Sequence, residues 1–138
     1  MKKITALILA VTLLTAMCIP VSAAENTAQP YYINTNQARV VLAITESGSA
    51  EIHVSCIGNS NATKIQTTTY LQRKVGSTWV KVSIGQTNNQ WTATSNTSYL
   101  LKDYSHQLST AGQYRAVTVF TVSGSQSETF TLYSEATY

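Results

Sequence analysis

Few residues of this chain have side chains suited to acid–base or nucleophilic chemistry. The 138 residues include six Asp and Glu and two His. Asp103 and His106 lie three residues apart, with Ser105 and Ser109 close by, so this segment holds the residue types of a Ser-His-Asp triad. The Gly-x-Ser-x-Gly turn that exposes a nucleophilic serine does not accompany them. Side chains this close together in a loop usually face water, and we therefore expect no catalytic residue.

Cys56 is the one cysteine that remains if a leader containing Cys18 is removed, so no intrachain disulfide is expected. Ile52, Val54 and Cys56 alternate in one phase, which predicts a thiol in the core. His53 points to the opposite face of the same strand and cannot activate that thiol. An intermolecular bridge or a nucleophile is the alternative role for Cys56.

Metal and cofactor motifs are missing from the sequence. It contains no Cys-x-x-Cys, no His-x-x-x-His, no Asp-rich calcium loop and no Gly-rich phosphate loop. Glu46 and Glu51 flank one expected turn, which is more typical of a soluble turn than of a glycosidase pair. We therefore expect neither a metal nor a cofactor.

Aromatic side chains near amides are better candidates for a site. Trp91 lies within Asn89-Gln90-Trp91-Thr92, and Tyr99 and Tyr104 border an expected strand. Aromatic rings beside amides are used both by sugar-binding sites and by protein hot spots. We predict Trp91, Tyr99 and Tyr104 as ligand-binding residues. The alternative is that the two tyrosines are half-buried strand residues and that Trp91 covers one end of the domain.

The N-terminus has the order of a secretory signal peptide. Lys2 and Lys3 precede an uncharged apolar stretch over residues 4–21, which ends on small residues. This pattern predicts a signal peptide over residues 1–24, cleaved after Ala23 or Ala24, and a protein secreted from the cell. An N-terminal membrane anchor is the alternative, which the short length of the apolar stretch disfavours.

Composition constrains the remaining 114 residues. Loss of Lys2 and Lys3 lowers the net charge from +3 to +1, and the basic residues that remain are scattered. A nucleic-acid or anionic-membrane partner needs a basic cluster, so neither is expected. Ser, Thr, Asn and Gln account for 49 of the 114 residues, which is typical of an extracellular β surface. We expect one domain, a monomer, with an extracellular protein or a glycan as partner.

Short apolar runs separated by turn residues predict an all-β fold. An extended lead-in is expected over residues 25–37, a domain over residues 38–138, and a loop with one short strand over residues 85–98. About seven strands, each with one apolar face, favour an antiparallel two-sheet sandwich. The main strands are expected at Arg39–Thr45, Glu51–Ile57, Ile65–Val75, Trp79–Ile84, Tyr99–Tyr104, Gln113–Val122 and Glu128–Tyr133.

The segment Leu108–Val122 resembles the E–F corner and F strand of immunoglobulin-like and fibronectin type III-like domains. In those folds a Tyr after a Gly-containing turn bonds back to the preceding loop, and the resemblance implies this tyrosine-corner role for Tyr114. An antibody-type domain would have a Cys two residues later, where this chain has Ala116. The resemblance therefore implies the general sandwich and excludes the antibody-like branch.

Two further resemblances concern larger parts of the chain. Tyr70–Val82, with a Gly76 turn and Trp79, resembles the C–C′ hairpin of the same folds and implies a structural role for Trp79. The chain as a whole resembles small secreted proteins of Gram-positive bacteria that have a leader and one domain. That resemblance implies a compartment but no activity.

Three functions follow in order of preference. The first is a secreted binding protein without a catalytic site. The second is a structural subunit that assembles when residues 25–37 of one copy join the sheet edge of another. The third is a small enzyme or inhibitor acting through Asp103 and His106.

Overall fold

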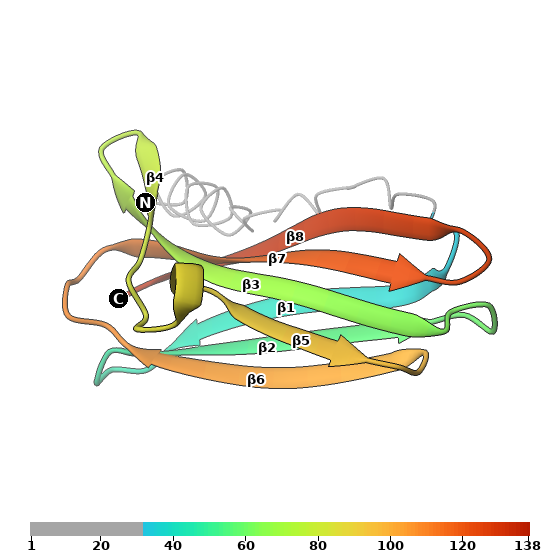
Figure 1. The fold of residues 1–138 in the computed structure, drawn as a ribbon. Helices are drawn as coiled ribbons and strands as arrows, with labels where there is room; N and C mark the ends of the chain where they lie inside the picture. The colour runs from blue at the N-terminus through green and yellow to red at the C-terminus, as the bar shows by residue number, and fades with distance from the viewer. Residues whose placement is uncertain (1–31) are drawn as a thin grey trace, which may run out of the picture. The chain divides into compact units, whose positions relative to one another are not determined.

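Two antiparallel β sheets pack face to face, because each strand carries apolar residues on one side that a second sheet must cover (Figure 1). The structure is a computed structural model, and it describes residues 32–138. The expected leader and the first part of the lead-in lie outside the described residues and stay predictions. The described elements are β1 (Thr35–Ile44), β2 (Ser49–Gly58), β3 (Lys64–Val75), β4 (Thr78–Lys81), the 3-10 turn η2 (Thr87–Asn89), β5 (Trp91–Ser95), β6 (Tyr99–Gln107), β7 (Gln113–Ser123) and β8 (Ser127–Thr137).

One sheet has three strands in the order β1-β2-β6, and the other has five. In the five-stranded sheet the order is β4-β3-β7-β8, and β5 pairs with β3 further along the same side as β4. The fold is an immunoglobulin-like antiparallel sandwich, as predicted. It has eight strands, one more than the seven or so expected, and β5 is the short strand expected within residues 85–98.

The core lies between the two sheets and is filled by alternate residues of the central strands. Along β2 every second residue from Ala50 to Cys56 is buried, while the residues between them lie on the outer face. The largest fully buried side chains include Phe120, Ile52 and Ile65. Each such side chain contributes about 1.5–3 kcal/mol of hydrophobic free energy to folding.

Two local features match the resemblance to immunoglobulin-like domains. The Tyr114 hydroxyl donates a hydrogen bond to the carbonyl of Thr110, four residues upstream, which is the geometry of a tyrosine corner. The β3–β4 hairpin pairs Val75 with Thr78 across a two-residue loop. Gly76 takes φ +60° in this loop, a conformation that glycine adopts without steric cost.

Several strands differ in length from the prediction. Pairing with β2 carries β6 on to Gln107, beyond the expected end at Tyr104. Pairing with β7 likewise carries β8 to Thr137. The fourth strand is shorter than expected, because its pairing with β3 ends at Lys81. Local residue preference does not reveal these limits, since they depend on where a partner strand lies.

The first strand begins within the expected lead-in. Thr35 starts β1, three residues before the expected domain boundary at residue 38. The Glu128 carboxylate on β8 accepts hydrogen bonds from the amides of Ile33 (2.6 Å) and Asn34 (3.1 Å) and from the Thr35 hydroxyl. Asn34 is fully buried, and its side chain donates to the carbonyl of Gln126 at 2.7 Å. The end of the lead-in is therefore part of the sandwich.

Candidate functional site

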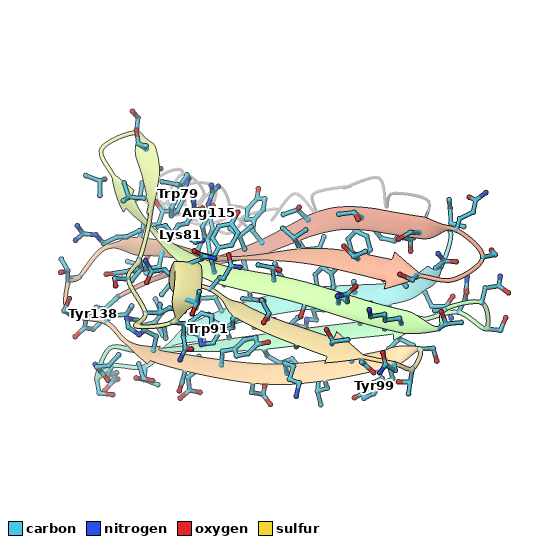
Figure 2. All side chains as sticks on the ribbon, in the orientation of Figure 1. Trp79, Lys81, Trp91, Tyr99, Arg115 and Tyr138 are labelled. Atoms are coloured by element: carbon cyan, nitrogen blue, oxygen red, sulfur yellow. The ribbon has the colours of Figure 1, made fainter. Side chains whose placement is uncertain are left out.

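The structure brings two of the three predicted ligand-binding residues together. Trp91 on β5 stacks on Tyr104 of β6, with ring centroids 5.1 Å apart and planes 13° from parallel. Tyr99 lies at the other end of β6, and Figure 2 places it far from Trp91. Tyr99 is 52% exposed on the outer face of the three-stranded sheet. It therefore belongs to a different surface.

The loop before Trp91 is held in one conformation by its own hydrogen bonds. Asn88 and Asn89 have positive φ angles of 56° and 50°, which asparagine tolerates better than most residues. The Asn89 side-chain oxygen accepts hydrogen bonds from the Ile84 amide (3.2 Å) and the Ser83 hydroxyl (3.3 Å). Lys81 Nζ donates to the Asn88 carbonyl at 2.8 Å. These bonds order the loop before any ligand arrives, which lowers the entropy lost on binding.

A concavity of about 410 Å³ opens between this loop and the stacked rings. Its side chains offer amide and hydroxyl groups and an aromatic surface, and none of them carries a charge. Such a surface can donate to and accept from several hydroxyl groups while a ring packs against C–H groups. We call it the Trp91 concavity; it is lined by Gln86, Thr87, Asn88, Gln90, Trp91, Thr92 and Tyr104.

The Tyr104 ring packs against one face of the Trp91 ring, and the Tyr104 hydroxyl is buried. The hydroxyls of Tyr104 and Thr67 are both buried and have no hydrogen-bond partner among residues 32–138. Burial raises the pKa of Tyr104, although the nearby Thr67 hydroxyl partly opposes this effect. A neutral, buried hydroxyl is unsuited to ligand contact, so Tyr104 acts through its ring.

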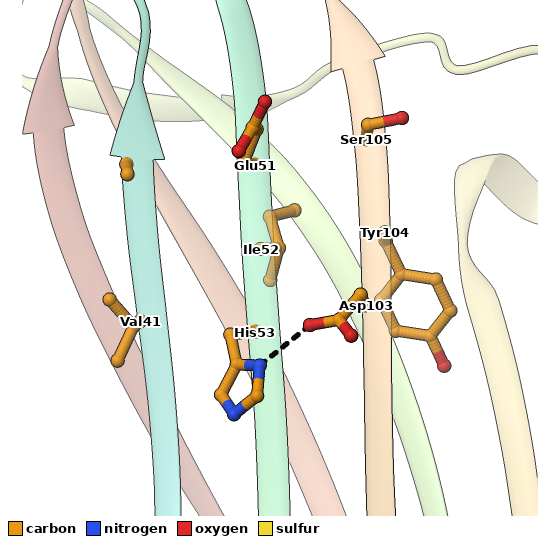
Figure 3. Close-up of a pocket in the computed structure, with 8 residues that line it drawn as sticks. Val41, Glu51, Ile52, His53, Asp103, Tyr104 and Ser105 are labelled. Atoms are coloured by element: carbon orange, nitrogen blue, oxygen red, sulfur yellow. Dashed lines mark hydrogen bonds and ion pairs between the residues drawn. The ribbon is translucent and has the colours of Figure 1, made fainter.

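A second concavity, of about 350 Å³, lies on the outer face of the three-stranded sheet. Here His53 Nδ1 and Asp103 Oδ1 are 2.6 Å apart across β2 and β6 (Figure 3). The other ring nitrogen of His53 points away from Ser105, which is paired with Glu51 further along the strands. A triad needs that nitrogen beside the nucleophile, and this geometry does not provide it.

Asp103 and His106, the residues of the least preferred of the three functions, are not brought together. The segment is part of β6 rather than a loop, so residues three apart point to opposite faces. Asp103 pairs with His53, and His106 lines a different concavity next to Leu108 and Tyr114.

Cys56 lies in the core, as its alternation with Ile52 and Val54 predicted. Its side chain is fully buried and forms no disulfide. Burial raises the pKa of the thiol from 9.0 to about 11, because a thiolate would lose its hydration there. A thiol with a raised pKa is a poor nucleophile at neutral pH.

Trp79, predicted as structural, lies on the outer face of the five-stranded sheet together with residues that sequence reasoning missed. The Arg115 guanidinium lies over the Trp79 ring, 4.4 Å from its centroid, and 5.7 Å from that of Tyr133 (Figure 2). Alternation along β7 places Arg115 on the outer face. The strand register that joins it to Trp79 and Tyr133 comes only from the tertiary structure.

Comparisons with known proteins do not add to this description. No family model matches the chain, and no curated protein matches its sequence. Within residues 32–138 no three His, Cys, Asp or Glu side chains lie close enough to share a metal ion. The same part of the chain contains no helix of the length and apolarity that a membrane crossing needs.

Proposed function

We propose that this protein is exported through its N-terminal leader and acts outside the cell as a non-catalytic binding module for a glycan. The basic, apolar and small-residue order of residues 1–24 supports export. The resemblance to small secreted proteins of Gram-positive bacteria agrees with it.

The Trp91 concavity carries the proposal of glycan binding. It combines one aromatic surface, stacked on Tyr104, with amides and hydroxyls on a loop that internal hydrogen bonds hold in place. Sugar rings present C–H groups on their faces and hydroxyls at their edges, so this surface complements them. The His53–Asp103 pair is open to water, with side chains 45% and 74% exposed, and lacks an aligned nucleophile, so it supports no competing hydrolytic role.

The test is NMR titration of the mature protein with cellotetraose, chitotetraose and tetragalacturonic acid. The chain has two tryptophans, and their indole N–H signals report two separate places on the surface. We expect at least one oligosaccharide to shift the Trp91 signal, and Trp91→Ala to abolish binding. Tyr99→Ala is the matched control, because it removes an exposed ring from the other sheet and should leave binding unchanged.

Trp91 also packs against the core, so a second variant guards against loss of folding. Gln90→Ala keeps the tryptophan and removes one amide from the rim of the concavity. We expect it to weaken binding by roughly fivefold to tenfold, as for the loss of about one hydrogen bond. An unmoved Trp91 signal with all three oligosaccharides would contradict the proposal.

A protein partner is the second candidate, and an exposed apolar patch favours it. Ile57 and Tyr99 are paired across β2 and β6, and Leu101 lies one row further on the same face. These side chains are 40%, 52% and 43% exposed. Contiguous exposed apolar groups often mark protein contacts. Loss of partner binding in Leu101→Ser, with glycan binding unchanged, would assign this patch to a protein.

A further inference from the structure

Cationic and aromatic side chains alternate on the outer face of the five-stranded sheet, at the end that carries β4. The register places Lys81, Gln72, Arg115 and Glu135 in one row across the four strands. Tyr70 and Tyr133 lie on either side of Val117 in the next row. We call this surface the outer-sheet cluster; it consists of Tyr70, Lys74, Trp79, Lys81, Arg115 and Tyr133.

Each cation of the cluster lies over an aromatic ring. Arg115 lies over Trp79 and Tyr133, Lys74 Nζ is 5.7 Å from the Trp79 centroid, and Lys81 Nζ is 4.8 Å from that of Tyr70. Ring contacts restrict the side chains and displace part of the water around their charges. The cations are therefore ordered in advance of any ligand.

Arg115 is further oriented by a hydrogen bond. Its Nε donates to the Gln72 side-chain oxygen at 2.7 Å. This contact and the two flanking rings hold the guanidinium plane, while its terminal nitrogens make no hydrogen bond to another of the described residues. A guanidinium in this state can donate two parallel hydrogen bonds to a carboxylate.

The charges of the cluster are not balanced within the described part of the chain. Lys74, Lys81 and Arg115 form no ion pair there; the one ion pair in residues 32–138, His53–Asp103, lies on the other sheet. Glu135 faces Arg115 in the register, but its carboxylate accepts a hydrogen bond from the side-chain amide of Gln113 at 3.0 Å. Three cations with one acidic neighbour favour an anionic ligand.

The cluster adjoins the Trp91 concavity. Lys81 Nζ donates to the carbonyl of Asn88 and lies 3.4 Å from the side-chain oxygen of Gln90, and both residues line the concavity. Figure 2 shows Lys81 between Trp91 and the pair formed by Trp79 and Arg115. A chain-like ligand can therefore lie in the concavity and reach the cluster.

We propose that the ligand is an acidic glycan that carries carboxylate groups, with a sugar ring in the Trp91 concavity and a carboxylate on Arg115 and Lys74. This inference rests on the proposed function, because it names the class of glycan for the same site. A long ligand is required, since one sugar ring cannot cover both surfaces.

The test compares tetragalacturonic acid with its fully methyl-esterified form, which has the same sugar rings without the charges. We expect the acid to shift the indole signals of both Trp79 and Trp91. The ester should shift that of Trp91 alone and bind about tenfold more weakly, the difference typical of one good charged contact. Added salt should weaken binding of the acid and leave binding of the ester unchanged.

Two variants distinguish the cluster from the rest of the surface. Arg115→Gln combined with Lys74→Gln should reduce the affinity for the acid to that for the ester. Arg39→Gln is the matched control, because it removes an exposed cation from the other sheet and should change neither affinity. Thermal melting of each variant confirms folding.

Each outcome bears on one of the two proposals. If the Trp91 signal moves and acid and ester bind equally, glycan binding stands and the acidic class is wrong. If the double variant binds the acid like the Arg39 control, the cluster is not the contact. If polyglutamate shifts the Trp79 signal as strongly as the acid does and leaves that of Trp91 unmoved, the cluster serves an acidic protein. If the Trp91 signal moves with cellotetraose or chitotetraose but not with the acid, glycan binding stands and the acidic class is wrong. If none of these oligosaccharides moves the Trp91 signal, the glycan proposal itself fails.

Discussion

The Cys56 side chain has no contact with solvent, and its position accounts for its chemistry. Burial between the sheets raises the pKa of the thiol to about 11. A reagent that needs the thiolate therefore meets two barriers, the raised pKa and the closed core. The thiol is a small apolar group within the packing and not a link between chains in the folded state.

At the residue scale we predict that iodoacetamide leaves Cys56 of the folded protein unmodified at pH 8 and labels it fully after unfolding. Because the folded pKa exceeds the ordinary value of 9.0, the stability contributed by the neutral thiol is complete below pH 9 and is lost as the pH rises through 11. Urea unfolding at pH 8 to 11 measures this loss. Cys56→Ala should start less stable and lack this part of the pH dependence; an equal slope in both proteins would contradict the assignment.

At the scale of elements, β1 and β8 are joined by side chains rather than by strand pairing. Glu128 on β8 holds the chain that enters β1, and the Ser134 hydroxyl accepts a hydrogen bond from the Leu42 amide at 3.0 Å. Capping of this kind satisfies backbone groups at an open sheet edge, which would otherwise attract another strand. It also holds residues 33–35 within their own domain, which limits the predicted strand addition to the preceding residues.

Glu128→Ala should loosen the start of β1 and lower the free energy of unfolding by about 2 kcal/mol, because it removes hydrogen bonds to a charged acceptor. We expect the Ile33 and Asn34 amides to exchange with solvent faster, as measured by hydrogen–deuterium exchange. Glu135→Ala is the control, since it removes a carboxylate from the same strand that bonds Gln113 instead. Equal protection of both amides in the two variants would show that Glu128 does not hold this segment.

At the scale of the whole molecule, the described domain separates its surfaces by sheet. The three-stranded sheet exposes the apolar patch of Ile57, Tyr99 and Leu101 beside the acidic groups Glu51 and Asp103. The five-stranded sheet exposes the cationic and aromatic outer-sheet cluster. The two outer faces therefore differ in chemistry, and each can make a different kind of contact.

We predict that the mature protein is a monomer by light scattering, with and without reductant. The buried Cys56 cannot bridge two folded copies, and residues 33–35 are engaged in their own domain. The protein should remain a monomer after deletion of residues 25–31. Polymers that disappear on this deletion would instead support assembly by strand addition, and dimers lost on reduction would identify Cys56 as the link.

The sequence alone determined the fold class and the core phase of the strands, because alternation selects which face of a strand is buried. The resemblance to immunoglobulin-like domains implied the corner at Tyr114, and the Tyr114–Thr110 hydrogen bond has that geometry. The sequence also predicted Trp91 as a ligand-binding residue from its position among amides, and this stays a prediction. It did not show that Tyr99 lies on a different surface from Trp91 or that Asp103 pairs with His53, because both depend on which strands lie side by side.

Only the tertiary structure decided which strands lie side by side, and this determined which residues share the proposed binding surfaces. Asp103 meets His53 because β2 pairs with β6, fifty residues apart. Arg115 meets Trp79 and Tyr133 because β7 lies between β3 and β8, and β4 lies beyond β3. Register within a hairpin follows from its turn, whereas the pairing of β2 with β6 and of β3 with β7 joins segments far apart in the chain and depends on the packing of the whole sandwich. The alternation of residues therefore predicted on which face of a sheet each side chain lies, and strand pairing decided which side chains lie next to one another on that face.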